Sequence, residues 1–372
     1  MTRFLAGLGV HGTAGLSFSP TLGASVWFGV RHAWLGLRLL GRADLPTSLD
    51  VTGGSVVINV LAASLVPCVH ILDALGVCAV GTVGGLQVNG RLDHRNRVVM
   101  FGGFKRQYTR AEDTWEWDGR SWTRRVPPAS PPARGYHAMA YDSARQQTVL
   151  FSGEAVGADT WLWNGTTWVA ATPVGPTPEA REGHVMAYDA QRQRVVLFGG
   201  YIHPTPVAPY RIANDTWEWD GTSWARRTPA NSPPARRAVV MVYDPVRSRT
   251  VLFGGEDDTR RSLADSWEWD GTNWTHKHGT GPSRTNATGV YDPLRQRVLA
   301  IGGQFVTITP YQVVARSDTW EWDGTTWSLR PVVLPLIGER DGTAAAFDAA
   351  SGLTVLFGGR AHGYHSDTWL LR

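Results

Sequence analysis

One pattern recurs six times along this chain, and it limits the possible folds more than any other feature. The segment DTWEWDG and its close variants begin at Asp113, Asp159, Asp215, Asp265, Asp318 and Asp367, 46 to 56 residues apart. Each is preceded by FGG or a near match, and that motif by an aspartate that follows Tyr or Phe in five of the six units. Periods of this length are typical of stacked repeats, so each repeat should be one structural unit.

Each unit has the pattern of four short β-strands. In the second unit, the alternating segment His137–Asp142 is the first strand. The apolar run Thr148–Phe151 suits a second strand buried on both faces. In the first unit, the third strand ends at Asp118-Gly119, where both residues tolerate positive φ, so a hairpin turn should lead into a fourth strand.

Tryptophan is unusually frequent, with 18 copies, and most of it follows the repeat. Trp115 and Trp117 are two residues apart on a strand, so they share one face, and Trp122 falls on the same face across the hairpin. A single small sheet cannot bury such a face, whereas sheets stacked in a ring can. We therefore predict a core made of Trp115, Trp117, Trp122, Trp161, Trp163, Trp168, Trp217, Trp219, Trp224, Trp267, Trp269, Trp274, Trp320, Trp322, Trp327 and Trp369.

These motifs resemble the kelch repeat. The shared features are an apolar strand that ends in Gly-Gly, an Asp-x-aromatic-x-aromatic-Asp strand and a downstream Trp. The resemblance covers residues 84–372 and implies an all-β fold, a six-bladed kelch-type β-propeller of the galactose-oxidase-like superfamily. It says little about activity, because propellers carry many unrelated functions.

Residues 1–83 carry no repeat signature and form an apolar N-terminal extension. We expect this extension to be loosely ordered or partly helical. A membrane tether through residues 55–81 is less favoured, because this stretch includes Asn59, Pro67, His70 and Asp73. The sixth unit stops after its third strand, and kelch propellers often close by borrowing a strand from the other terminus. We therefore expect a strand from just before residue 84 to complete it.

Five arginines each lie eight residues before a repeat aspartate, at Arg134, Arg181, Arg236, Arg284 and Arg340. If the first strands line a central channel, these residues would form a positive collar that binds a carboxylate or phosphate. The favoured alternative is that each arginine has a partner inside its own repeat. Buried strand glutamates such as Glu116 and Glu218 would need such partners.

The two longest loops, Tyr201–Asn214 and Gln304–Ser317, join second and third strands and carry aromatic and aliphatic side chains. Such loops suit an interface with a protein or glycan. The candidate contact residues are Tyr201, His203, Tyr210, Phe305 and Tyr311. We expect a binding module rather than an enzyme. The alternative is an enzyme that acts on a small anionic sugar, as in the kelch-type sialic acid mutarotases.

Other functions are disfavoured. Galactose-oxidase copper chemistry needs a Tyr cross-linked to Cys, and the repeats contain no cysteine. No histidine set has zinc-like spacing with carboxylates, so we expect neither a metal nor another cofactor. A net charge of +4, with Arg interleaved among Asp and Glu, does not indicate a nucleic-acid partner. We expect a monomer, in a bacterial envelope or secreted rather than in the cytoplasm.

Overall fold

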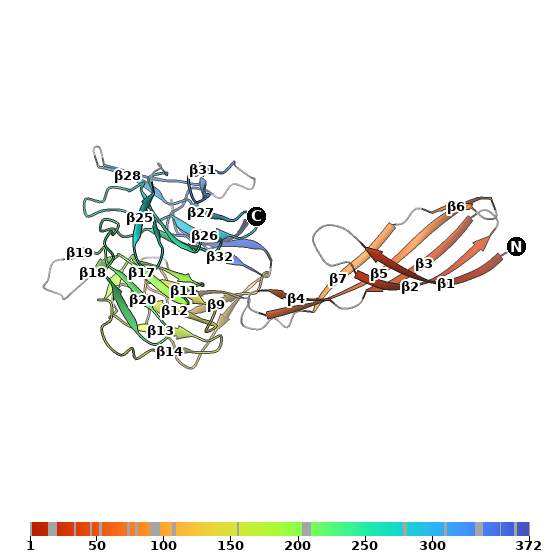
Figure 1. Cartoon of the computed structure of the whole chain (residues 1–372), viewed down its shortest axis with the longest axis horizontal. Helices are drawn as coiled ribbons and strands as arrows, with labels where there is room; N and C mark the ends of the chain where they lie inside the picture. The colour runs from red at the N-terminus through yellow and green to blue at the C-terminus, as the bar shows by residue number, and fades with distance from the viewer. Residues whose placement is uncertain are drawn as a thin grey trace. The chain divides into compact units, whose positions relative to one another are not determined.

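The computed structural model (Figure 1) contains β-strands and no helix among the residues it describes. It describes residues 97–371 except 106–108, 155, 203–209, 278–280, 309–310, 332–337, 350 and 361–362, and before residue 97 only the backbone of seven strands. The chain divides into two compact units, residues 1–95 and 96–372. The repeat motifs alone place the boundary between residues 83 and 84. Within the described residues, no helix is long and apolar enough to cross a membrane.

The first unit is one antiparallel sheet with the order β1-β2-β3-β5-β4, in which β6 and β7 also pair with β5. Its strands are β1 (Thr2–Thr13), β2 (Thr21–His32), β3 (Leu35–Asp44), β4 (Thr47–Val51), β5 (Gly54–Leu72), β6 (Leu75–Cys78) and β7 (Gly81–Asn89). The expectation of partial helix was therefore wrong for these residues. Apolar runs such as that of β5 are rich in Val and Ile, and their periodicity does not separate helix from strand.

The predicted ring-closing strand is not found in the described residues. The segment just before residue 84 lies in β7, which pairs with β5, and the sixth repeat sheet ends at an edge strand that pairs only with its inner neighbour. Residues 86–89, which lie within the span 84–372 of the repeat resemblance, also belong to β7. The resemblance to known motifs predicted that a further strand completes the sixth repeat, but it did not identify the segment that forms this strand.

The repeats form small antiparallel sheets with their strands in chain order, which we number repeat sheets 1 to 6. Sheets 1 to 3 contain β8 (Val98–Phe101), β9 (Thr114–Trp117) and β10 (Trp122–Arg125); β11 (Ala138–Asp142), β12 (Gln147–Phe151), β13 (Thr160–Trp163) and β14 (Trp168–Ala170); and β16 (Val185–Asp189), β17 (Arg194–Phe198), β20 (Thr216–Trp219) and β21 (Trp224–Arg227).

Sheets 4 to 6 contain β22 (Val240–Asp244), β23 (Arg249–Phe253), β24 (Ser266–Trp269) and β25 (Trp274–Lys277); β26 (Thr288–Asp292), β27 (Arg297–Ile301), β30 (Thr319–Trp322) and β31 (Trp327–Leu329); and β32 (Ala344–Asp348), β33 (Leu353–Phe357) and β34 (Thr368–Leu371). The first strands of consecutive sheets lie side by side from β11 to β32, and β32 also contacts β8. This arrangement is consistent with a β-propeller (Figure 1).

The hairpin between third and fourth strands has the predicted turn chemistry. Trp117 pairs with Trp122 across a four-residue loop, and the Asp118 carboxylate accepts hydrogen bonds from the backbone N–H groups of Arg120 and Ser121 at 2.9 and 2.8 Å. Gly119 has a φ of +94°, a conformation that costs glycine little. The Asp-Gly pair therefore fixes the position of the fourth strand against the third.

The predicted tryptophan core is observed. Of the sixteen side chains, ten are buried and six, including Trp115 and Trp122, are half-buried. One cluster shows the arrangement: Trp217, Trp219 and Trp224 of sheet 3 pack together against Val149 and Phe151 of sheet 2. The shared face expected from strand parity is thus the face that each sheet presents to the preceding one.

Each fourth-strand tryptophan makes the same two contacts with the preceding sheet. Its ring packs against the Phe that ends that sheet's second strand. Its indole Nε1 donates a hydrogen bond to the hydroxyl of a residue in that sheet's third strand. The hydrogen bonds, at 2.8–3.0 Å, join Trp168 to Thr114, Trp224 to Thr160, Trp274 to Thr216, Trp327 to Ser266 and Trp122 to Thr368. The last of these joins sheet 1 to sheet 6.

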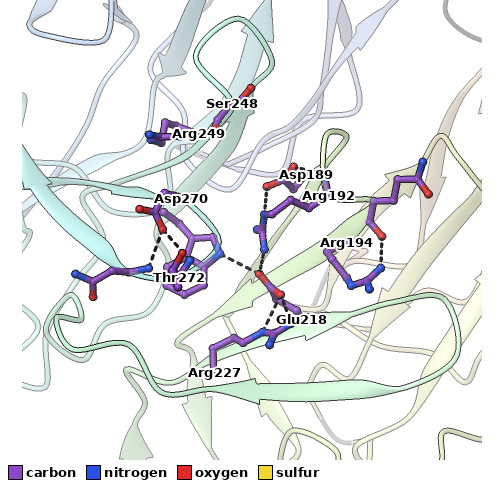
Figure 2. A network of polar contacts seen from close by, with 12 residues as sticks. Asp189, Arg192, Arg194, Glu218, Arg227, Ser248, Arg249, Asp270 and Thr272 are labelled. Carbon is purple, nitrogen blue, oxygen red and sulfur yellow. Dashed lines mark hydrogen bonds and ion pairs between the residues drawn. The ribbon is translucent and has the colours of Figure 1, made fainter.

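A buried glutamate in the third strand is the centre of a second recurring network. Figure 2 shows Glu218, which accepts hydrogen bonds from Arg227 at 2.8 Å, from the Trp269 indole at 3.0 Å and from Arg192, itself paired with Asp189. Glu116 and Glu268 likewise accept from an indole of the next sheet. These networks give the buried carboxylates the partners that they need.

Candidate functional site

A cavity of about 170 Å³ opens among the segments that enter the first strands and those that follow Gly-Gly. Its lining comes from five consecutive repeats. It includes Tyr136, Glu182, Arg237, Glu256, Gln304 and Arg360. Because five repeats converge on it, this cavity is the point at which the repeat architecture gathers different side chains.

A chain of backbone hydrogen bonds fixes the positions of these segments. The N–H of Gly183 donates to the carbonyl of Tyr136, Ala238 to Gly183, Asn286 to Ala238 and Gly342 to Asn286, at 2.8–3.0 Å. All five residues have φ between +51° and +62°. This region is unfavourable for residues other than glycine, so the neighbouring sheets must hold Tyr136, Ala238 and Asn286 in place. The cavity therefore has a preformed backbone frame.

The charged side chains of the cavity wall are fixed in position by hydrogen bonds and ring contacts with neighbouring residues. Arg237 Nε donates to Glu256 at 2.8 Å, and its guanidinium carbon lies 5.0 Å from the centre of the Tyr201 ring. Tyr201 in turn stacks on Tyr210, with ring centres 5.2 Å apart. On another side, Arg360 Nε donates to Asp341 at 2.9 Å. The wall thus presents fixed groups of both signs, which suit a polar ligand group with both donors and acceptors.

The rim is more open and more aromatic than the wall. Tyr136 is 46% exposed and Tyr311 is 62% exposed, and both also line the cavity. Arg260 is exposed and has no ion pair among the described residues. Tyrosine and arginine, with tryptophan, are enriched at the energetic centre of protein interfaces.

The two loops named from the sequence contribute to this region. Loop Tyr201–Asn214 includes β18 (Tyr201–Ile202) and β19 (Arg211–Ile212), and loop Gln304–Ser317 forms β28 (Gln304–Ile308) and β29 (Tyr311–Ala315). Tyr210 and Tyr311 are exposed, while Tyr201 and Phe305 are half-buried. His203 lies outside the described residues.

The five arginines expected either as a collar or as structural residues are buried and paired. Each guanidinium bonds the aspartate that begins the third strand of its own repeat, in the pairs Arg134–Asp159, Arg181–Asp215, Arg236–Asp265, Arg284–Asp318 and Arg340–Asp367. Four of them also donate to the carbonyl of the second residue of the Phe-Gly-Gly or Phe-Ser-Gly motif that follows in the same repeat. This geometry favours the structural alternative over an anion-binding collar.

Asp215 and Asp265 are held in the charged form. For Asp215, burial by itself would raise the pKa, but the hydrogen bond and charge of Arg181 outweigh burial and lower it. The pKa of Asp265 is lowered in the same way by Arg236, against the effect of burial. The strand-three aspartate also accepts a hydrogen bond from the indole two residues on, as Asp215 does from Trp217 at 2.7 Å. Each pair therefore anchors a first-strand entrance to a third strand.

His137 and His184 lie at equivalent positions, each with its ring edge-on to a Phe of the preceding sheet. Burial, with a smaller contribution from the neighbouring arginine, lowers the pKa of His137 to about 4 and that of His184 well below its usual value. They are thus neutral packing residues at neutral pH. Among the described residues, no group of three or more His, Cys, Asp or Glu is placed to hold a metal ion.

Sequence reasoning missed the charged wall, although a signal was present. Glu182, Arg237 and Asp341 each directly follow a constant arginine, and Glu256 and Arg360 directly follow a constant Gly-Gly. Their types vary from repeat to repeat while both flanking motifs do not. Variable residues beside fixed structural ones are what a repeat protein uses for recognition.

No protein-family model matches this chain, and no match is found among the curated proteins.

Proposed function

We propose that the repeats form a closed, six-bladed kelch-type β-propeller. The five indole–hydroxyl hydrogen bonds support closure, because the bond from Trp122 to Thr368 repeats between sheets 1 and 6 the contact made between consecutive sheets. The contact between β32, the first strand of sheet 6, and β8, the second strand of sheet 1, supports the same conclusion. The six recurring Asp-x-Trp and Gly-Gly segments supply one blade each.

The propeller acts as a binding module for a protein partner, which inserts one polar side chain into the cavity among the first-strand entrances. The single observation that carries this proposal is the cavity itself, about 170 Å³ in volume, with a charged wall and exposed tyrosines at its rim. Pockets for drug-sized ligands measure roughly 300–1,000 Å³, so this one suits a single side chain.

The rim favours a protein over a free small molecule. Tyr311 and Val313 on β29 are 62% and 46% exposed, and Tyr210 is 60% exposed. Exposed aromatic side chains are enriched where protein partners bind, and tyrosine is among the residues that most often act as hot spots. The fixed backbone frame lowers the entropy cost of binding, because little has to be ordered when the partner arrives.

Selection of a random dodecapeptide library on the full chain tests this proposal. Peptides that bind should lose about tenfold or more in affinity with Arg260→Ala or Tyr311→Ala, because both residues line the cavity. Tyr141→Ala is the matched control, since Tyr141 is also exposed but lies near the other end of β11. Peptides indifferent to the cavity variants would contradict the proposal. So would saturable binding to a glycan array with no peptide selected.

A further inference from the structure

One hairpin turn of the repeats carries an amide where its counterparts carry a carboxylate. The turn between the third and fourth strands begins with Asp-Gly in sheets 1, 3, 4 and 5, at Asp118, Asp220, Asp270 and Asp323. In sheet 2, between β13 and β14, the same turn begins with Asn164-Gly165. The chain contains one other asparagine that precedes a glycine, Asn89, and it lies outside the repeat sheets.

The turn holds Asn164 as the other turns hold their aspartates. Its side-chain oxygen Oδ1 accepts hydrogen bonds from the backbone N–H groups of Thr166 and Thr167 at 2.9 and 3.0 Å. Asp220 accepts two backbone hydrogen bonds in the same way, at 2.8 Å each. Asn164 is exposed, and within the described residues its amide nitrogen Nδ2 makes no hydrogen bond. The turn therefore uses the oxygen of this amide and not its nitrogen.

The neighbouring groups suit an attack on this amide. The backbone nitrogen of Gly165 can bond to the side-chain carbon Cγ of Asn164 through a five-membered ring, and glycine has no Cβ to obstruct the approach. In the part of the chain that the structure describes, the Gly165 N–H donates no hydrogen bond. The N–H groups of Thr166 and Thr167 already point at Oδ1, where negative charge develops during the attack, as in an oxyanion hole.

We propose that Asn164 is a site of spontaneous deamidation, which gives the turn of sheet 2 the carboxylate that the other turns have. The Gly165 nitrogen loses its proton to a base from solvent and bonds to Cγ of Asn164, and the amide nitrogen leaves as ammonia. Water then opens the cyclic imide. Cleavage of the bond between Cγ and the Gly165 nitrogen gives aspartate, whereas cleavage at the main-chain carbonyl carbon gives isoaspartate.

The fold favours aspartate over isoaspartate as the product. The two N–H groups that bind Oδ1 activate the Cγ carbonyl of the imide toward water, and attack there restores the ordinary main chain. Isoaspartate would instead add a methylene to the main chain before Gly165, whose φ is +92° in this turn. Asp220 shows that a carboxylate suits such a turn. Burial there opposes ionisation, yet hydrogen bonds from backbone N–H and hydroxyl groups lower the pKa of Asp220 to about 2.

Peptide mapping of the full chain after incubation at mildly alkaline pH tests this proposal. The tryptic peptide of residues 146–181 contains Asn164 as its only asparagine, and its mass should rise by about 1 Da as the amide is replaced. The free peptide WLWNGTTW, residues 161–168, has the same reacting atoms without the repeat sheet. Fragmentation spectra should show a ratio of aspartate to isoaspartate at least about threefold higher in the folded chain than in the free peptide.

Two protein variants complete the test. Asn164→Gln keeps an amide but would need a larger ring, so its tryptic peptide should stay unmodified. Asn164→Asp copies the product and should raise Tm at neutral pH by about 1–3 °C, because a charged acceptor forms stronger hydrogen bonds. An intact Asn164 in the folded chain after the free peptide has reacted would overturn the proposal, as would equal product ratios or a lower Tm of Asn164→Asp. Because Asn164 does not line the cavity, failure here leaves the proposed cavity function standing.

Discussion

The indole Nε1 of Trp122, in repeat sheet 1, donates to the hydroxyl of Thr368, in repeat sheet 6, at 2.9 Å, although 246 residues separate the two in the chain. The Trp122 ring also lies 5.5 Å from that of Phe357, centre to centre. Both contacts are those that Trp168, Trp224, Trp274 and Trp327 make with the sheet that precedes each of them. The first and last repeats therefore meet as if they were consecutive.

The Glu218 network should be asymmetric in its contribution to stability. Glu218→Ala leaves Arg192, Arg227 and the Trp269 indole without their common acceptor, so the free energy of unfolding should fall by about 3–5 kcal/mol. Arg227→Ala removes only one donor, whose side chain is 40% exposed, and should cost about 1 kcal/mol or less. Urea unfolding of both variants would measure this difference, and equal losses would contradict the network's central role for Glu218.

The repeat arginines should behave as structural residues. Arg236→Gln leaves Asp265 without its bidentate partner, so we expect a loss of about 3 kcal/mol or more in the free energy of unfolding. Asp265→Asn in the same chain should recover part of this loss, because no uncompensated charge remains. Chemical denaturation of the single and double variants checks this. A stable Arg236→Gln variant that loses affinity for phosphate or sugar acids would instead restore the collar hypothesis.

Acid should destabilise the repeats through their buried histidines. His137 and His184 have a lower pKa when folded than when unfolded, so the unfolded chain binds more protons as the pH falls. The stability that these neutral histidines contribute is therefore fully present above pH about 6.5, and it is lost progressively as the pH falls toward the folded pKa of His137, about 4. His184→Val copies the residue at the equivalent position, Val239, and should flatten the pH dependence of Tm between pH 6.5 and 4.5. An unchanged slope would rule out this cause.

The energetic cost of positive φ in the cavity frame should be measurable by substituting a glycine that has free space around it. Gly342 has a φ of +62°, and a Cβ there would meet nothing within 4 Å, so Gly342→Ala tests conformation alone. We expect a loss of about 1 kcal/mol in stability. Gly363 also has open space but no positive φ, so Gly363→Ala is the control and should be neutral or slightly stabilising. Equal effects at both positions would show that the frame is not strained.

The repeat sheets and their core were predictable because they depend on local rules. Strand parity places Trp217 and Trp219 on one face, and Asp-Gly turns then bring Trp224 to that face whatever the rest of the chain does. The indole acceptors were not predictable in the same way. The bond from Trp224 to Thr160 depends on which face meets which neighbour, and spacing within one repeat carries no such information.

The charge pairing shows a similar limit. We expected the repeat arginines to seek partners within their repeats, and they do, but the partner is the third-strand aspartate rather than the strand glutamate. Arg181 and Asp215 are 34 residues apart and Arg134 and Asp159 only 25, because the intervening loops differ in length. Variable loop length hides such a pair from any fixed spacing.

Two indoles without an acceptor are explained by exceptions to the repeat pattern. Nε1 of Trp219 and of Trp117 is buried without an acceptor among the described residues. The strand glutamate that serves this indole elsewhere is replaced by Leu162 in sheet 2, which packs beside Trp219, and by Leu370 in sheet 6. The sequence therefore contains the reason for both exceptions, once sheet 6 is taken as the neighbour of sheet 1.

A double-mutant cycle between Trp122 and Thr368 tests the closed ring most directly. Trp122→Phe removes the indole N–H and Thr368→Val removes the hydroxyl, and each should lower the free energy of unfolding by about 1 kcal/mol. In a closed ring the double variant loses less than the sum of the two, with a coupling energy of about 0.5–1.5 kcal/mol. Strictly additive losses would mean that the first and last repeats do not touch, and the ring would have to be abandoned.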